Sequence, residues 1–491
     1  MTSQSHTTEL AELNRIFQAQ RAAFERHAPL SRARRLEALD ALLQLVLSSQ
    51  DAIAEAINAD FGQRAAIETR LLEIFPLVDE IRHIKRHLAR WMRPRPVPVN
   101  WQFLPSRACV LYQPLGVVGI VGAWNYPLLL ALSPLAEALA AGNHVLLKPS
   151  ENAPRCAAWL RQALASIFPP EYVTVVEGDR DLSAAFVSLP FDHVLFTGST
   201  QVGRLVMKTA AENLTPVTLE LGGKSPALVH EEFPVAEAAD RICSAKFWNA
   251  GQTCVAPDYA LVHKRRLENF VEACEQSVLQ RFPQPIANPH YTHMSGPAAW
   301  KRMKELVEDA RAKGAEIRPI GAAEVSSSGS GPWPPTLILA VSDSMRVMQE
   351  EIFGPLLPVL GYSSMTQALD WMRSRPRPLA FYYFDRDSRR VREVLEQTWS
   401  GGVTVNDCIF HLPQHDLPFG GIGHSGMGSY HGFDGFATFS KKKGVFRQSR
   451  LSGIVMDRFF KPPYPRAGKV ALDVLIGKAG KKPVRRFRLD V

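Results

Sequence analysis

The sequence of 491 residues predicts an α/β fold in which helices cover both faces of a parallel sheet. The first observation is a series of short apolar runs at regular spacing: 117–121, 145–147, 173–176, 194–196 and 217–221. The second is a set of segments of helical composition between these runs: 128–141, 153–166, 181–188 and 201–213. Strands that alternate with helices at this spacing indicate βαβ units. The alternation resumes between about residues 223 and 400, which predicts a second α/β region.

The segments outside these two regions follow other patterns. Residues 31–61 predict two amphipathic helices, because apolar residues recur there at helical spacing. The sequence PRPVPV at 94–99 ends the helical pattern, and residues 108–112 predict a strand of an arm or an edge ribbon. SSSGSGPWPP at 326–335 predicts a surface loop.

Charge and cysteine content limit the classes of protein to consider. The formal charge is +9, and six basic residues lie near the C-terminus: Lys478, Lys481, Lys482, Arg485, Arg486 and Arg488. Such a run is either a clamp for acidic lipid or nucleic acid or a solvated tail. We favour the tail, because a short basic run binds phosphates well only when something positions it.

The six cysteines include no CxxC pair, so we expect no disulfide framework and a cytoplasmic location. The N-terminal residues lack the apolar stretch of a secretory signal. The most apolar helical segment, 128–141, is shorter than the roughly 18 residues that a membrane span requires. We therefore expect no integral membrane segment.

Two strand-to-helix turns are candidates for binding a nucleotide cofactor. FTGSTQVG at 196–203 could hold a phosphate on the backbone amides and dipole of the helix that it starts, although it is not a GxGxxG motif. LLKPSE supplies a cation, Lys148, and a carboxylate, Glu151, which could bond ribose hydroxyls. Taken singly, Lys148 is equally a surface lysine, and Glu151 a helix-start residue that the dipole favours.

Cys254 in FWNAGQTCVAPDY is the candidate nucleophile. An isolated thiol is usually a small buried hydrophobe, and it becomes a nucleophile as the thiolate, which needs a base or a cation nearby. Glu220 in LELGGKSP ends a predicted strand, where burial would raise the pKa of a carboxyl towards neutrality and suit it to act as a general base. The alternative for Glu220 is a structural ion pair.

Two further motifs supply groups for the same chemistry. Asn125 in AWNYP is a candidate donor to an oxyanion, or else it caps a helix that Pro127 begins. Glu351 and Phe353 in QEEIFGP lie two residues apart, so they could bond a ribose and pack against a flat ring. The alternative for this segment is a loop that ends in a turn.

In this order, the motifs resemble those of the aldehyde dehydrogenase superfamily from about residue 30 to 445. The resemblance is carried by AWNYP, LLKPSE, FTGSTQVG, LELGGKSP, GQTCVAP, EEIFGP and LPFGGIGHSGMGSYHG. Within the superfamily, NWQFLP, NAGQTCVAPDY and KPPYP are most similar to the class 3-like branch, and in particular to coniferyl aldehyde dehydrogenases.

The resemblance implies a role for each matched residue. Cys254 would attack the aldehyde carbonyl, Asn125 and the Cys254 backbone N–H would hold the oxyanion, and Glu220 would activate the water that hydrolyses the thioester. Cofactor contacts are implied for nine residues: Trp124, Lys148, Glu151, Gly198, Ser199, Gly203, Leu221, Glu351 and Phe353. The implied cofactor is NAD or NADP. We favour NAD, because the Glu151 carboxylate would repel a 2′-phosphate.

The resemblance also implies an architecture. A Rossmann-type parallel-sheet cofactor domain would comprise residues 1–100 and 113–221, and an α/β catalytic domain residues 222–403. A small β oligomerisation arm would comprise residues 101–112 and 404–450, and a basic tail residues 451–491. We expect a homodimer, no nucleic-acid partner, and at most weak peripheral membrane contact through the basic tail. The implied substrate is an aromatic enal such as coniferyl aldehyde, or a medium-chain aliphatic aldehyde.

Two other reactions and a metal site remain as alternatives. A CoA-acylating relative is expected to lack the base, and a cofactor-independent cysteine hydrolase or acyltransferase would need a histidine partner, for which the 14 histidines offer no recognisable motif. His83 and His87 lie four residues apart, but Ile84 replaces the glutamate of an HExxH motif. We therefore expect these histidines at the surface and no metal.

Overall fold

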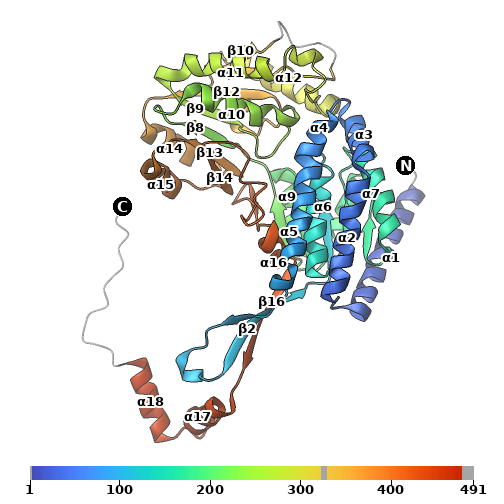
Figure 1. Cartoon of the computed structure of the whole chain (residues 1–491), viewed down its shortest axis with the longest axis vertical. Coiled ribbons are helices and arrows are strands. Elements are labelled where there is room, and N and C mark those ends of the chain that lie inside the picture. The colour runs from blue at the N-terminus through green and yellow to red at the C-terminus, as the bar shows by residue number, and fades with distance from the viewer. Residues whose placement is uncertain (1–2, 322–328, 478–491) are drawn as a thin grey trace. The chain divides into compact units, whose positions relative to one another are not determined.

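The computed structural model describes residues 3–321 and 329–477 (Figure 1). The first part of the predicted surface loop, residues 326–328, and the basic run from Lys478 to Arg488 lie outside the described residues. The contacts divide the chain into two units. The large unit comprises residues 1–91 and 113–441, and the small unit comprises residues 92–112 and 442–491.

A six-stranded sheet forms the first half of the large unit, in the order β15-β7-β6-β3-β4-β5. Its parallel strands are β3 (Val117–Val121), β4 (His144–Lys148), β5 (Val173–Val175), β6 (His193–Thr197) and β7 (Val217–Glu220). The short strand β15 (Gly426–Met427) pairs with β7 in the antiparallel sense. The predicted parallel sheet is confirmed, and its strands are buried because helices cover both faces.

The helices between these strands lie close to the predicted segments: α6 (Leu129–Ala141), α7 (Pro154–Ile167), α8 (Arg180–Val187) and α9 (Thr200–Ala211). The predicted pair of amphipathic helices is also present, as α2 (Arg32–Ser48) and α3 (Gln50–Phe61). The N-terminal part adds α1 (Ser3–His27), α4 (Ala66–Thr69) and α5 (Phe75–Trp91), with a short π-helix at Arg70–Ile74. Apolar side chains of α1 enter the core of the six-stranded sheet, and the sequence pattern did not predict this helix.

A seven-stranded sheet forms the second half of the large unit, in the order β10-β11-β12-β9-β8-β13-β14. Its strands are β8 (Pro226–Val229), β9 (Tyr259–His263), β10 (Glu316–Pro319), β11 (Thr336–Leu339), β12 (Leu356–Tyr362), β13 (Ala380–Phe384) and β14 (Gly402–Val405). All neighbours are parallel except β10 and β11. The main helices are α10 (Val235–Phe247), α11 (Leu267–Arg281), α12 (Gly296–Ala312), α14 (Met365–Arg373) and α15 (Ser388–Gln397).

The prediction of a surface loop at 326–335 is wrong at its end. Trp333 is 1% exposed and packs edge-on against Trp300 of α12, with ring centroids 5.1 Å apart. The loop therefore returns to the core before β11 begins, because its one large apolar side chain is buried there.

The small unit contains a three-stranded sheet in the order β1-β2-β16, made of β1 (Arg95–Val97), β2 (Arg107–Pro114) and β16 (Ser440–Arg447). The predicted strand at 108–112 lies within β2. Two helices follow the sheet, α17 (Arg450–Phe460) and α18 (Arg466–Ile476). Among the described residues, every helix is too short or too polar to cross a bilayer.

Candidate active site

The predicted site residues follow neighbouring strands of the six-stranded sheet. Glu220 ends β7, Asn125 follows β3, and Lys148 ends β4. The register places Thr197 beside Glu220 and Val121 beside Lys148. Because the carboxyl ends of parallel strands meet at one edge, a single edge of the sheet carries these groups.

A strained turn positions Cys254. The chain leaves α10 and passes through Asn249 and Ala250, whose φ values of 51° and 49° lie in the left-handed region. Gly251 follows with φ 72°, and a Cβ added there would lie 2.4 Å from the Gly354 carbonyl oxygen. Non-glycine residues in this conformation are held by their surroundings, so the turn is fixed before the half-buried Cys254 is reached.

Hydrogen bonds join Asn125 to this turn. The Asn125 side-chain amide donates to the Gln252 carbonyl at 3.1 Å, and the Asn249 amide donates to the Asn125 carbonyl at 3.0 Å. One residue further along each segment, the hydroxyls of Tyr126 and Thr253 are 2.6 Å apart. The structure therefore brings Asn125 and the residues next to Cys254 together.

Glu73, rather than Asn125, caps the helix that follows AWNYP. Its carboxylate accepts the backbone N–H groups of Leu128 and Leu129 at 2.8 and 3.1 Å. The capping alternative for Asn125 is thus contradicted, and α6 begins at Leu129 rather than at Pro127. Asn125 is free of a capping role, and its side-chain amide has a second N–H besides the one bonded to the Gln252 carbonyl.

A buried ion pair that the sequence analysis missed supports this turn. Arg64 lies 2.8 Å from Glu73, and both side chains are 0% exposed. Arg64 also donates to the Asn125 carbonyl at 3.3 Å. Its guanidinium lies over the Phe61 and Tyr126 rings at 5.2 and 5.0 Å. Burial raises the pKa of Glu73, and Arg64 opposes that rise.

Glu220 is buried at the end of β7 with 3% exposure. Neither of its carboxylate oxygens has a hydrogen-bond partner among the described residues, which disfavours the ion-pair alternative. Burial raises the pKa of Glu220 well above its usual value. A carboxyl with these properties is suited to accept a proton near neutral pH.

The paired glycines after Glu220 make room for Glu351. A Cβ on Gly222 would lie 2.0 Å from a Glu351 carboxylate oxygen, so a side chain there would displace the carboxylate. The Gly223 backbone N–H donates to Glu351, and burial raises the pKa of Glu351 to about 8. Its Oε1 has no partner among the described residues, so it can accept a donor from a ligand.

Electrostatics connect the thiol to both carboxyls. The pKa of Cys254 is raised to about 12 by burial first, then by Glu351 and Glu220. The backbone N–H groups of Cys254 and Val255 oppose this rise, because they stabilise a charge on the sulfur. Cys254, Glu220 and Glu351, far apart in sequence, thus lie close enough to influence one another.

A second ion pair, also missed, fixes the segment that carries Glu351 and Phe353. Lys224 pairs with Asp258 and donates to the carbonyls of Val347 and Glu350 at 2.7 and 3.1 Å. Asp258 in turn accepts the Ile352 backbone N–H at 3.0 Å. Lys224 lies in LELGGKSP and Asp258 directly follows GQTCVAP, so these two motifs also hold EEIFGP in place.

The candidate cofactor residues at the end of β4 form a charged pair. The Lys148 ammonium is 3.6 Å from the Glu151 carboxylate and donates to the Pro149 carbonyl at 3.0 Å. Lys148 is 1% exposed, which contradicts the surface-lysine alternative, and burial lowers its pKa. Glu151 does not start α7, which begins at Pro154 and is capped by the Asp60 carboxylate.

The turn after β6 has the features of a phosphate site. Ser199 caps α9, and its hydroxyl accepts the Val202 backbone N–H at 3.3 Å. A Cβ on Gly198 would lie 2.5 Å from the Phe196 ring, and one on Gly203 would lie 2.6 Å from Leu221. The glycines therefore let the helix N-terminus approach the sheet closely, as a phosphate site requires.

Aromatic rings lie beside this edge. Trp124 and Phe353 meet edge to face, with ring centroids 5.5 Å apart, although 229 residues separate them in the sequence. Phe353 has a φ of 52°, which is rare for a bulky residue and marks a segment held by its neighbours. The geometry fits a flat ring near Phe353, with Glu351 as an acceptor beside it.

Comparisons with known proteins identify the family. The model described as "Aldehyde dehydrogenase family" matches residues 2–445. The chain belongs to the aldehyde dehydrogenase family.

Individual members of the family are similar over most of their length. A probable coniferyl aldehyde dehydrogenase of Pseudomonas aeruginosa is 48% identical over 464 residues, which are 94% of this chain and 96% of that protein. A coniferyl aldehyde dehydrogenase of a Pseudomonas species is 43% identical, over 90% of this chain and 92% of that protein. A substrate-bound structure of Staphylococcus aureus AldH is 33% identical with a TM-score of 0.87, over 94% of this chain and 99% of that one. An NAD+ complex of a Bacillus cereus aldehyde dehydrogenase is 25% identical with a TM-score of 0.81, over 90% and 89%.

This aldehyde dehydrogenase family member also contains a buried acid pair that the sequence analysis missed. Glu137 of α6 accepts the His431 backbone N–H at 2.8 Å. A Cβ on Gly435 would lie 2.0 Å from the Glu137 carboxyl. The pKa of Glu137 is raised well above its usual value by burial and then by the neighbouring Glu80. The two carboxyls therefore tend to share one proton.

The prediction that His83 lies at the surface is wrong. His83 is 6% exposed, because it belongs to the buried face of α5, and its ring centroid lies 4.2 Å from that of His87 and 5.1 Å from that of His415. Within residues 3–321 and 329–477, no cluster of His, Cys, Asp and Glu has the arrangement of a metal site.

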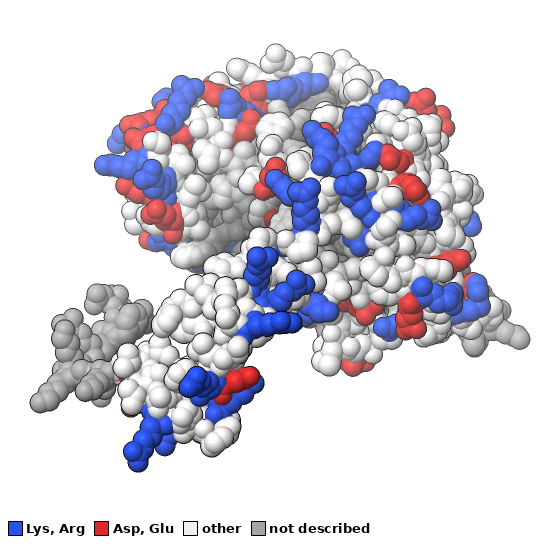
Figure 2. Space-filling view, turned by 60° about the horizontal axis from the view of Figure 1, so that its bottom comes forward, with Lys and Arg blue, Asp and Glu red and all other residues white. Residues whose placement is uncertain are grey.

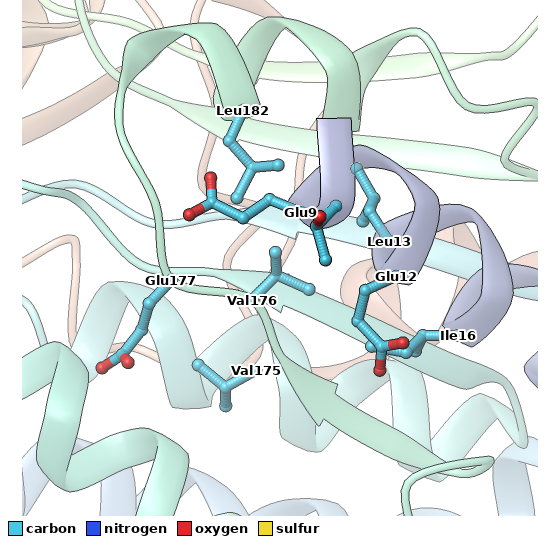
Figure 3. Close-up of a pocket in the computed structure, with 9 residues that line it drawn as sticks. Glu9, Glu12, Leu13, Ile16, Val175, Val176, Glu177 and Leu182 are labelled. Carbon is cyan, nitrogen blue, oxygen red and sulfur yellow. The ribbon is translucent and has the colours of Figure 1, made fainter. Parts of the chain in front are cut away.

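One described pocket lies away from all of these residues. Its volume is about 480 Å³, and it lies between α1 and the chain from Val175 to Leu182 (Figure 3). Glu9, Glu12 and Glu177 project around an apolar floor, and none of the predicted site residues lines it. It carries none of the groups that the chemistry at Cys254 needs.

Proposed function

We propose that the chain oxidises an aldehyde to the carboxylic acid with NAD or NADP, through a covalent intermediate on Cys254. The observation that carries the proposal is the convergence at one sheet edge. Asn125 is bonded to the turn before Cys254, and the thiol lies within electrostatic reach of Glu220 and Glu351. Nucleophilic catalysis on a carbonyl requires these three parts: a thiol, an oxyanion donor and a base.

The proposed reaction has two stages. The Cys254 sulfur attacks the aldehyde carbonyl to give a thiohemiacetal, whose oxyanion receives hydrogen bonds from the Asn125 amide and the Cys254 backbone N–H. Loss of hydride then leaves a thioester on Cys254. Glu220 takes a proton from water, and the hydroxide displaces the sulfur to give the acid. The unpartnered carboxylate of Glu220 supports the last role.

The cofactor would bind along the same edge. Glu151 and Lys148 would hold the adenosine ribose, the turn of Gly198, Ser199 and Gly203 the pyrophosphate, and Glu351 the nicotinamide ribose. Leu221, Trp124 and Phe353 would line the path of the cofactor and its ring. When bound, NAD(P) supplies the electrophilic ring that accepts hydride. We favour NAD, because the half-exposed Glu151 carboxylate would repel a 2′-phosphate.

The proposed substrate is an aromatic enal of the coniferyl aldehyde type, with medium-chain aliphatic aldehydes as the second class. The names of the relatives at 48% and 43% identity support the first class. A CoA-acylating activity is disfavoured by the buried, unpartnered Glu220. The Lys148–Glu151 pair and the Ser199 cap of α9, which we propose as cofactor contacts, disfavour a cofactor-independent hydrolase.

We further propose that residues 1–100 and 113–221 form the cofactor-binding domain and residues 222–403 the catalytic domain. The segments 101–112 and 404–450 would bridge between subunits of a homodimer. The two sheets of the large unit support the division into two α/β domains. At the bounds the sheets differ from it, because β1 (Arg95–Val97) pairs in the three-stranded sheet of the small unit and β15 (Gly426–Met427) pairs in the six-stranded sheet.

The test is an assay of reduced-cofactor absorbance with a panel of aromatic and aliphatic aldehydes and each cofactor. We expect Cys254→Ala to abolish turnover, whereas Cys109→Ala, which changes a half-buried thiol of the small unit, leaves it intact. Glu220→Gln should give one burst of reduced cofactor followed by slow release of acid. Turnover of Glu220→Gln at the native rate would remove Glu220 from the role of base.

A further inference from the structure

Two consecutive residues of the turn before Cys254 have a backbone conformation that L-amino acids rarely adopt. Asn249 has φ 51° and ψ 31°, and Ala250 has φ 49° and ψ 34°. Neither residue is a glycine, so the conformation persists only where neighbouring groups hold it. The partner of the first N–H in this pair, that of Asn249, therefore decides how firmly the turn is held.

That partner is the carboxylate of Glu68, which lies in α4 and is 181 residues away in the sequence. Its Oε1 accepts the Asn249 backbone N–H at 2.6 Å. Its Oε2 accepts the hydroxyl of Thr292, a residue that is 1% exposed. Hydrogen bonds to an ionised carboxylate are shorter and stronger than those between neutral groups. One side chain thus joins α4, the turn and the chain that precedes α12.

The chain around Thr292 is also bound to the turn directly. The side-chain amide of Gln252 donates to the His293 carbonyl at 3.0 Å, and its oxygen accepts the Ser295 backbone N–H at 2.8 Å. Gln252 is 0% exposed, so these bonds are shielded from water. Thr292 is therefore a fixed donor, against which the carboxylate of Glu68 is held in place.

The half-buried Glu68 differs from most acidic residues at the surface. On the face that Figure 2 shows, red acidic residues mostly lie next to blue basic ones. The two arginines nearest to Glu68 in sequence, Arg64 and Arg70, pair with Glu73 and Asp51 instead. The Glu68 carboxylate is thus left for its two neutral donors.

We propose that Glu68 is a positioning residue for Cys254, which rests on the proposed function of Cys254 as the nucleophile. By fixing Asn249, Glu68 also fixes the oxyanion donor, because the Asn249 side-chain amide donates to the carbonyls of Asn125 and Gln252 at 3.0 and 3.1 Å. A looser turn would move the thiol and this donor relative to each other, and a displacement of about 1 Å can slow a reaction about a hundredfold. The proposed cofactor contacts lie on other segments, so cofactor binding should not change.

The test compares Glu68→Ala and Glu68→Gln with the native enzyme by steady-state kinetics and by hydrogen–deuterium exchange. We expect Glu68→Ala to lower kcat about tenfold to a hundredfold without a change in the KM for the cofactor. Backbone N–H groups in peptides that cover residues 249–256 should exchange faster, because the turn opens more often. Glu68→Gln should recover most of the kcat, since its amide oxygen can accept the Asn249 N–H and its amide N–H can donate to the Thr292 hydroxyl. Glu55→Ala changes an exposed glutamate of α3 and, as the matched control, should behave as the native enzyme.

Thr292→Val is the second variant for the case that Glu68→Ala does not fold, because it removes one hydroxyl at nearly constant volume. We expect a smaller fall in kcat and faster exchange in the same peptides. Native kcat and native exchange in a folded Glu68→Ala, or in Thr292→Val where Glu68→Ala does not fold, would overturn the proposal. Faster exchange throughout the six-stranded sheet would also overturn it, because Glu68 would then support the fold as a whole.

The failure of this proposal differs from the failure of the proposed function. An inactive Cys254→Ala beside a fully active Glu68→Ala rejects only the role of Glu68. A Cys254→Ala enzyme that turns over at the native rate rejects the reaction itself.

Discussion

Replacing Arg64 by methionine tests whether the buried ion pair beneath AWNYP holds the site together. The pair joins two side chains of 0% exposure at 2.8 Å, so the substitution leaves the Glu73 carboxylate buried without its counter-ion. Removal of one partner from such a pair typically costs about 3–5 kcal/mol in the free energy of unfolding. The two backbone N–H groups of Leu128 and Leu129 still bind Glu73, so we expect the lower part of this range.

The loss of stability in Arg64→Met should be larger at high pH than at low pH. Burial raises the pKa of Glu73 in the folded chain, and Arg64 restrains that rise. Without Arg64 the folded-state pKa rises further, so the folded state binds a proton that the unfolded state releases. Stability is then retained at pH values below the pKa of Glu73 in the unfolded chain. It is lost as the pH rises through the higher pKa of Glu73 in the folded chain. Urea unfolding at about pH 6 and about pH 8 should show the larger deficit at the higher pH.

Two variants serve as controls for this measurement. Arg64→Met combined with Glu73→Gln removes the unpaired charge and should recover much of the stability. Arg34→Met breaks the exposed pair with Glu37 at 2.6 Å, which should leave unfolding nearly unchanged. An Arg64→Met chain as stable as the native one, or equal losses in the single and double variants, would refute the reasoning.

Three further predictions concern the neighbouring groups. Gly222→Ala should weaken cofactor binding, measured by quenching of protein fluorescence, because its Cβ would lie 2.0 Å from the Glu351 carboxylate; unchanged affinity would show that the carboxylate need not lie there. The rate of acid release should fall as the pH drops through the raised pKa of Glu220, because only the carboxylate form accepts a proton. A rate that does not change between mildly acidic and neutral pH would contradict the role of Glu220 as base. The stability of Glu137→Gln relative to the native chain should increase as the pH rises, because the native pair of Glu137 and Glu80 then loses its proton, which destabilises the folded chain. A difference in stability that does not vary with pH would exclude the shared proton.

The sequence predicts the site edge well because the edge follows from strand order. Each of Asn125, Lys148 and Glu220 lies at or just after the end of a recognisable apolar run, and parallel strands bring such ends together. Gly198, Ser199 and Gly203 could be predicted for the same reason, because they follow the end of an apolar run. Their chemistry is local, so a short window of sequence contains the signal.

The supports of the site could not be predicted in this way, because they join residues that are distant in sequence. Arg64 stands in a polar segment without any motif, and its partner Glu73 looks like an ordinary helix residue. Trp333 lies among glycine, serine and proline, whose composition concealed a core residue. Helix α1 is polar on average, and only packing against the six-stranded sheet reveals its buried side chains.

The electrostatics of the free chain keep the Cys254 thiol protonated. Its pKa of about 12 reflects burial and the two carboxyls Glu351 and Glu220, against which only backbone N–H groups act. Because Glu351 is the larger of the two carboxyl contributions, a ligand that donates hydrogen bonds to Glu351 screens its charge and lowers the thiol pKa. If Cys254 is the nucleophile that we propose, its deprotonation is coupled to occupancy of the Glu351 position.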